Sequence, residues 1–158
     1  MTNLIVDKSP SIKWYTDLFP FFSLIESTVR RYDWLWTDVE VDAALPVPSN
    51  DKGIYWLSGD ALLEFVEQHP QFIWSVLSAI PPDSKNAATA VDCIPFADGN
   101  RSFWTGSPRP QPPNAMFEVV CWDSSSTLLI GADEPLADAF CRAYPGAVDL
   151  DAENSRRS

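Results

Sequence analysis

The chain has 158 residues, of which 46% are hydrophobic and 13% aromatic, a composition that suits one domain with a proper core. Its 22 acidic residues outnumber its 11 basic residues, and the formal net charge is −11. Such a charge repels nucleic acid phosphates and anionic membrane surfaces, so a nucleic-acid-binding protein is disfavoured. The same charge would attract a basic partner, although it can also serve solubility alone.

The N-terminal stretch, MTNLIVDKSPSIKW, lacks the charged start and long apolar core of a secretory signal. Its short apolar run, Leu4 to Val6, predicts a short edge strand. The most apolar segments, 18–25 and 72–80, are far shorter than the roughly 20 residues of a membrane-spanning helix. We therefore expect a cytoplasmic protein that does not bind membranes.

A helix is expected between Asp17 and Arg31, because apolar residues recur there at helical spacing and Pro20 can occupy the first turn. The next segment, Tyr32 to Asp42, alternates as a strand does. The alternation predicts two faces, one with Leu35, Thr37, Val39 and Val41, and the other with Trp34, Trp36, Asp38 and Glu40.

Residues 46–53 contain two prolines and a glycine and predict a loop. A short strand at 54–57 then leads into a helix that Ser58 caps and Pro70 ends. His69, the only histidine, stands at the end of that helix, where a role as a helix cap or as a partner of the helix dipole is more typical than catalysis.

Residues 72–80, FIWSVLSAI, have the length and composition of a buried strand. The segment from Ser84 to Asn114 is rich in proline and glycine, which favours long loops broken by short strands near 91–96 and 102–105. Its proline-rich part, SPRPQPPN at 107–114, could present an extended arm to a partner, but a stiff hairpin connection is the more economical interpretation.

The clearest signals lie between Ala115 and Tyr144. A β-rich run at 116–122, a polar turn at 123–126 and a second run at 127–130 predict a hairpin. After Gly131 the apolar period changes to that of a helix, which Asp133 can cap and Pro145-Gly146 ends. The chain is thus predicted to be one α+β domain over residues 1–150, with an antiparallel or mixed sheet, about three helices and a flexible tail at 151–158.

No phosphate-binding loop, nucleophile elbow, zinc-protease motif, calcium loop or dinucleotide fingerprint occurs. Cys93, Cys121 and Cys141 form no CxxC pair, and we expect all three to be small core residues. The carboxylates at 38, 40 and 42 share a strand face and could bind a hard cation, but such a row is more typical of a solvated face. We therefore predict neither a cofactor nor a metal.

Seven tryptophans cannot all sit in one small core, because each indole N–H needs a partner. The strand at 32–42 carries indoles next to carboxylates, a combination that suits a protein-binding face: aromatic anchors supply binding energy, and charges supply rate and selectivity. The predicted partner-binding face consists of Trp34, Trp36, Asp38, Glu40, Asp42 and Asp123.

Two stretches, IYWLSGDALLEF and WDSSSTLLIGADEPLADAFCRAYPGAVDL, resemble small acidic bacterial immunity proteins of polymorphic or contact-dependent toxin systems. The resemblance implies a cytoplasmic protein that binds and blocks one cognate toxin domain without catalysis or a cofactor. A basic toxin, such as a nuclease with a positive substrate groove, would fit the acidity. Two alternatives stay open: a small enzyme that uses carboxylates and His69, and an adaptor or structural module of a bacterial assembly.

Overall fold

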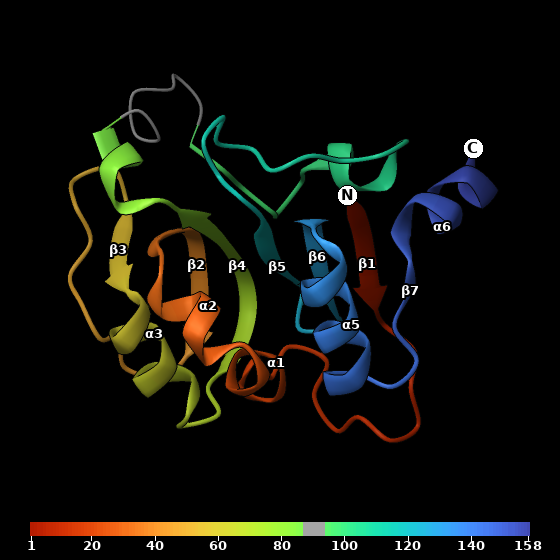
Figure 1. The fold of residues 1–158 in the computed structure, drawn as a ribbon, viewed down its shortest axis with the longest axis horizontal. Helices are drawn as coiled ribbons and strands as arrows, with labels where there is room; N and C mark the ends of the chain where they lie inside the picture. Colours follow the sequence, from red (N-terminus) through yellow and green to blue (C-terminus); the bar gives the residue numbers. More distant parts are fainter. Residues whose placement is uncertain (87–93) are drawn as a thin grey trace.

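A computed structural model describes residues 1–86 and 94–158 of the protein, and within them the chain builds a seven-stranded antiparallel sheet in the order β3-β2-β4-β5-β6-β1-β7 (Figure 1). The strands are β1 (Thr2–Val6), β2 (Asp33–Asp42), β3 (Tyr55–Ser58), β4 (Gln71–Ile80), β5 (Glu118–Trp122), β6 (Ser126–Ala132) and β7 (Val148–Asp149). The α-helices are α1 (Phe19–Leu24), α2 (Glu26–Arg30), α3 (Gly59–Val66), α5 (Glu134–Ala143) and α6 (Leu150–Arg157). The α+β prediction is confirmed, with five helices in these ranges where about three were expected.

The hairpin and helix at 115–144 form as predicted. Ser125 N donates to Trp122 O at 2.9 Å, and the two residues between them, Asp123 and Ser124, have φ of 48° and 58°, as in a type I′ turn. Asp133 Oδ1 accepts from Leu136 N at 3.0 Å and caps α5. Ser58 likewise accepts from Ala61 N and caps α3. Short-range capping and turn chemistry therefore determines these boundaries.

The helix expected at 17–31 is broken at Ile25, whose φ of −124° and ψ of 30° lie outside the helical region. The break yields two short helices, and it lets Phe21, Phe22 and Val29 all reach the sheet. Gly59, the first residue of α3, permits the close approach of α2, because a Cβ there would lie 2.3 Å from Val29 O.

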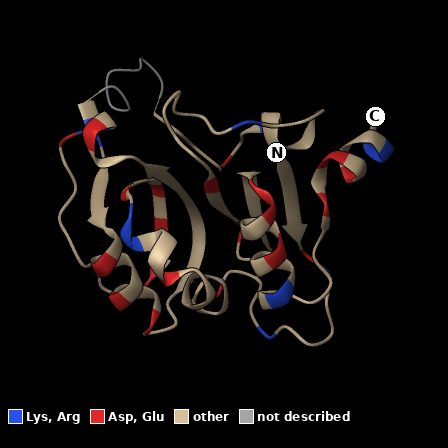
Figure 2. Ribbon diagram, viewed as in Figure 1, with Lys and Arg blue, Asp and Glu red and all other residues tan. Residues whose placement is uncertain are grey.

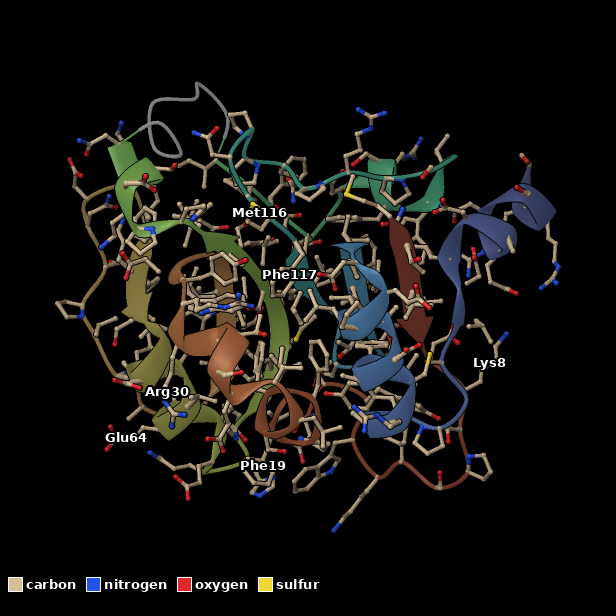
Figure 3. All side chains as sticks on the ribbon, viewed as in Figure 1. Lys8, Phe19, Arg30, Glu64, Met116 and Phe117 are labelled. Atoms are coloured by element: carbon tan, nitrogen blue, oxygen red, sulfur yellow. The ribbon has the colours of Figure 1, made fainter. Side chains whose placement is uncertain are left out.

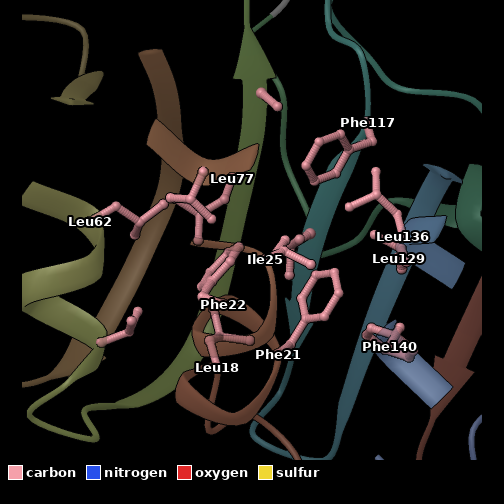
Figure 4. Close-up of a cluster of buried hydrophobic side chains, with 14 of the residues drawn as sticks. Leu18, Phe21, Phe22, Ile25, Leu62, Leu77, Phe117, Leu129, Leu136 and Phe140 are labelled. Carbon is pink, nitrogen blue, oxygen red and sulfur yellow. The ribbon is translucent and has the colours of Figure 1, made fainter. Parts of the chain in front are cut away.

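Helices α1, α2, α3 and α5 cover one face of the sheet, in front of it in Figure 1. The main core fills the space between them. Phe21 and Phe22 from α1, Leu62 from α3 and Phe140 from α5 pack with Leu77 of β4, Leu129 of β6 and Phe117, which directly precedes β5 (Figure 4). Burial of these large apolar side chains is the dominant stabilising contribution to the fold.

The opposite face is covered by the connection between residues 94 and 117 and by α6. A second core cluster forms there from Ile5, Val76, Val120, Leu128, Phe103 and Leu150, among others. The proline-rich segment lies across this face: Pro110 packs against Gly131, and Gln111 N donates to Glu118 Oε1 at 2.8 Å. It is part of the connection between the antiparallel strands β4 and β5.

Several local expectations are wrong. Residues 101–104 form a 3₁₀ helix, η2 (Arg101–Trp104), rather than a strand, because Asn100 Oδ1 accepts from Ser102 N and starts a helical turn. Residues 94–96 are not a strand, and 91–93 lie outside the described residues. A further short 3₁₀ turn, η1, spans Pro82–Ser84. β1 lies between β6 and β7 and is not an edge strand.

The tail expected to be flexible is helix α6. Asp149 Oδ1 caps it by accepting from Ala152 N at 2.8 Å, and Leu150 is fully buried. Asn154 is also buried, and its Nδ2 donates to Phe103 O and Gly106 O. Of the cysteines, Cys121 is buried as expected, Cys141 is exposed, and Cys93 lies outside the described residues.

Candidate functional site

Two of the residues predicted for the partner-binding face, Trp34 and Trp36, belong to the core. Both have 0% of their surface exposed. Trp34 Nε1 donates to Val29 O at 3.1 Å, and Trp36 Nε1 donates to Ser75 Oγ at 2.7 Å. With rings packed and N–H groups satisfied, neither is available to a partner, and this part of the prediction is wrong.

The error has a physical cause in β2. The register of β2 against β4 shifts between Thr37 and Glu40, and Asp38 has a φ of 50°. This irregularity interrupts the alternation, so Val39 and Val41 join Trp34 and Trp36 on the helix-covered side. Glu40 pairs with Trp74 and faces the other side of the sheet.

Asp38 has a structural task at this point. Its Oδ2 accepts from Ala97 N and from Asp98 N, both at 2.8 Å. Asp is among the few non-glycine residues that occupy the left-handed region readily. Asp38 therefore fastens the connection after residue 93 to β2 and is not a free partner-binding carboxylate.

Glu40, Asp42 and Asp123 are exposed, and none of them has an ion-pair partner in the described part of the chain. They lie at one end of the sheet: Asp42 pairs with Gln71 at the start of β4, and the turn at Asp123 is tied to the same place by Ser124 N donating to Ile73 O at 3.0 Å. The structure thus brings together three of the six predicted residues.

Two other tryptophans, Trp74 and Trp122, are near these carboxylates, and a third, Trp104, extends the row of rings. Trp74 and Trp122 are in edge-to-face contact with centroids 5.0 Å apart, and Trp122 and Trp104 are in the same arrangement at 4.8 Å. We call Trp74, Trp122 and Trp104 the tryptophan ladder. All three are only partly buried. Glu40 lies opposite Trp74 across β2 and β4, and Asp123 directly follows Trp122, so the ladder has carboxylates at one end.

The ladder differs from the buried tryptophans in its polar atoms. No indole N–H of the ladder donates a hydrogen bond within residues 1–86 and 94–158, and none is sealed from solvent. Indoles that combine apolar area with an unused donor are suited to protein contacts. The sequence signal for them was the position of Trp122 next to a polar turn and the period-two spacing that puts it on the Glu118 face.

The other end of the ladder is basic. Arg157 of α6 lies over the Trp104 ring, 4.8 Å from its centroid, and Arg101 precedes Trp104 in η2. The ladder therefore runs from two basic residues to two carboxylates, Glu40 and Asp123. A ligand that binds along it meets opposite charges at its two ends.

Beneath the proline-rich segment lies Glu118, which is fully buried. Its Oε1 accepts from Ser78 Oγ and Gln111 N, while its Oε2 has no partner among the described atoms. Loss of solvation raises the pKa of this carboxyl from 4.5 to about 7, although the two hydrogen bonds partly oppose the shift. Glu118 faces the interior and is not part of the ladder surface.

A second acidic surface lies on the helix-covered side. A groove of about 350 Å³ is lined by Phe19, Leu63 and Val66 and by the charged residues Glu26, Arg30, Asp60, Glu64 and Glu67. Arg30 is held by Glu26 and Asp60, while Glu64 and Glu67 have no ion-pair partner within the described ranges. Figure 2 shows acidic residues along α3 and α5, and Figure 3 shows Arg30 and Glu64 projecting from neighbouring helices.

His69 contacts Asp17, with 2.9 Å between Nδ1 and Oδ2. Asp17 is the only hydrogen-bond partner of the His69 side chain in the described part of the chain, so the pair lacks a nucleophile there. Cys121 supplies none, because burial raises the pKa of its thiol. The pair joins the start of α1 to the start of β4 and has a clear structural use.

Residues 1–86 and 94–158 contain no cluster of three or more His, Cys, Asp or Glu residues that could hold a metal ion. In the same ranges no helix has the length and apolarity needed to cross a bilayer. The chain matches no family model, no curated protein and no solved structure. The site must therefore be judged by its geometry and charge.

Proposed function

We propose that this protein is a binding protein of the immunity type, which occludes one basic toxin domain and does so without catalysis. The observation that supports this proposal most is the tryptophan ladder, which consists of three partly exposed indoles. Within residues 1–86 and 94–158 their N–H groups donate no hydrogen bond, and Glu40 and Asp123 at the acidic end have no ion-pair partner. The resemblance of the sequence to acidic immunity proteins supports the same function.

Two properties of the ladder surface favour a protein as the partner: its tryptophans and the acidic charge of the chain. Tryptophan is enriched among residues that dominate binding energy, and it loses little side-chain entropy when it is held by neighbouring rings. The net charge of −11 would accelerate the encounter with a basic surface. A nuclease, whose substrate groove attracts phosphates, presents such a surface.

The decisive experiment is co-expression with the product of the neighbouring upstream gene. If that product is lethal and this protein rescues growth, the proposal is supported; if it is not toxic, the proposal loses its main basis. Co-purification then provides an affinity for the pair.

Two matched double variants locate the interface. Glu40→Gln with Asp123→Asn removes two charges beside the ladder, and Glu64→Gln with Glu67→Gln removes two from the helix groove. We expect the first to weaken binding and its dependence on salt, and the second to leave both nearly unchanged. The reverse result would move the interface to the groove, and no effect of either would remove the electrostatic part of the proposal.

One observation favours a different function, that of a small enzyme: the 2.9 Å contact between Asp17 and His69, which resembles the orienting half of an acid–base site. A His69→Ala protein that keeps every measurable activity would count against it. An adaptor module, in contrast, would bind several partners weakly rather than one tightly.

A further inference from the structure

The basic end of the tryptophan ladder already holds a cation from the same chain. The guanidinium of Arg157 lies over the Trp104 ring, and tryptophan is the aromatic side chain that attracts cations most strongly. The helix that carries Arg157 is fixed by buried Leu150 and by the two hydrogen bonds of Asn154 to Phe103 O and Gly106 O. The contact therefore belongs to an anchored part of the fold.

The other two ladder rings, Trp74 and Trp122, contact each other and pack against the second core cluster. No cation of the described residues lies over Trp74 or Trp122, whereas lysines of the chain lie over Trp14 and Trp56. Both rings are partly exposed. Glu40 pairs with Trp74 across β2 and β4, Asp123 directly follows Trp122, and neither carboxylate has an ion-pair partner in the described ranges. Aromatic faces and a carboxylate are together the groups that a planar cation contacts most fully.

We infer that the acidic end of the tryptophan ladder binds a guanidinium group, so that the partner contributes an arginine side chain at Trp74 and Trp122. This inference rests on the proposed function and specifies the chemistry of its partner. Arg157 on Trp104 is the intramolecular counterpart of the same contact.

Arginine fits this end better than lysine for two reasons. Its guanidinium is flat and weakly hydrated, so it stacks on an indole at a small desolvation cost. It also presents several N–H donors in one plane, so it can stack and still donate to a carboxylate such as Glu40 or Asp123. A lysine ammonium is a compact and strongly hydrated charge, and it gains less from the same surroundings.

The test is a titration of the full-length protein followed by the indole N–H signals in NMR spectra. Two blocked peptides of equal length and charge serve as probes, one alternating arginine with glycine and the other lysine with glycine. We expect the arginine peptide to shift the signals of Trp74 and Trp122 and to bind about fivefold more tightly than the lysine peptide. The signals of Trp34 and Trp36 provide an internal control, because both are buried and hydrogen-bonded.

Two variants separate the ladder from other exposed tryptophans. Trp74→Leu should abolish the preference for arginine, whereas Trp14→Leu, at another exposed tryptophan, should leave it intact. Arg157→Ala frees the Trp104 ring, so it should add the Trp104 signal to those that shift.

Equal affinity for the two peptides, or shifts that avoid Trp74 and Trp122, would overturn the inference. Equal affinity at the ladder would still agree with the proposed function, because a basic partner would then be recognised by charge alone. If rescue from the toxic partner fails while arginine is still preferred, the proposed function falls and the guanidinium site stands.

Discussion

The two faces of the sheet use tryptophan in opposite ways. On the helix-covered face, Trp34 and Trp36 are fully buried and their N–H groups donate to Val29 O and Ser75 Oγ. On the face covered by the long connection, Trp74, Trp104 and Trp122 are partly exposed and donate to nothing in the described ranges. The helices cover their face of the sheet so that its tryptophans are excluded from solvent, whereas the irregular connection leaves the tryptophans on the other face partly exposed. Core and surface tryptophans of this protein therefore differ in whether the indole N–H donates a hydrogen bond within the described residues. The neighbouring residues in the sequence do not distinguish them.

The strongest test of this comparison is Trp34→Ala. Removal of a fully buried indole leaves a cavity in the main core, so we expect a loss of about 3–5 kcal/mol in the free energy of unfolding. Chemical denaturation measures it. A loss below about 1 kcal/mol would mean that the helix-covered face is not the main core.

The next largest effect is the pH dependence of stability that Glu118 causes on the face covered by the long connection. The pKa of Glu118 is raised in the folded state to about 7, so its contribution to stability is fully present below the unfolded value of 4.5 and is lost as pH rises through about 7. At higher pH the buried charge costs on the order of 3 kcal/mol. Glu118→Gln keeps the acceptor for Ser78 and Gln111 and should be more stable than the natural protein at about pH 9.

Denaturation curves of both proteins between about pH 5 and about pH 9 check this prediction. The difference between them should grow through neutrality. A constant difference would show that Glu118 does not titrate in this range.

A smaller effect is expected for Trp74→Leu, which tests function rather than folding. The ring is partly exposed, so stability should fall by only about 1 kcal/mol. Affinity for the partner should fall at least about tenfold if the ladder is the interface. Calorimetry on the co-purified pair compares Trp74→Leu with Trp14→Leu. Similar affinities for the two variants would remove the ladder from the interface.

The smallest effect is expected for His69→Gly. The pair with Asp17 is partly exposed and contributes at most about 1 kcal/mol. Glycine relieves the left-handed conformation of His69, whose φ is 53°, by a comparable amount. Thermal unfolding should therefore change little, and rescue from the toxin should be unaffected. If the protein has an enzymatic activity, and His69→Gly removes that activity without lowering stability, the result would instead support the alternative of a small enzyme.

Much of the fold could be predicted from the sequence because its signals are local. The cap at Asp133, the cap at Ser58 and the turn at Asp123 depend on side chains that bond to backbone a few residues away. The helix at the C-terminal tail is not predictable from the sequence because its anchors, Leu150 and Asn154, are single residues in a polar stretch. Their partners, Phe103 and Gly106, lie far away in the sequence.

The candidate site was predicted only in part. The carboxylates of Glu40, Asp42 and Asp123 are exposed as expected, but the tryptophans beside Glu40 in sequence are not those beside it in space. Alternation alone could not show that Asp38 shifts the register, nor which face the helices cover. Both depend on contacts between residues that are distant in the chain.

The place of β1 inside the sheet has a consequence for how the protein is made. Thr2 pairs with Ala132 and Leu4 with Asp149, so during synthesis β1 finds its strand partners only after the chain has been extended as far as β6 and β7. Until then, Leu4, Ile5 and Val6 are without the neighbours that bury them. Pairing across such sequence separations slows folding. We therefore expect the docking of β1 to limit the refolding rate, so that replacement of Ile5 by alanine slows refolding.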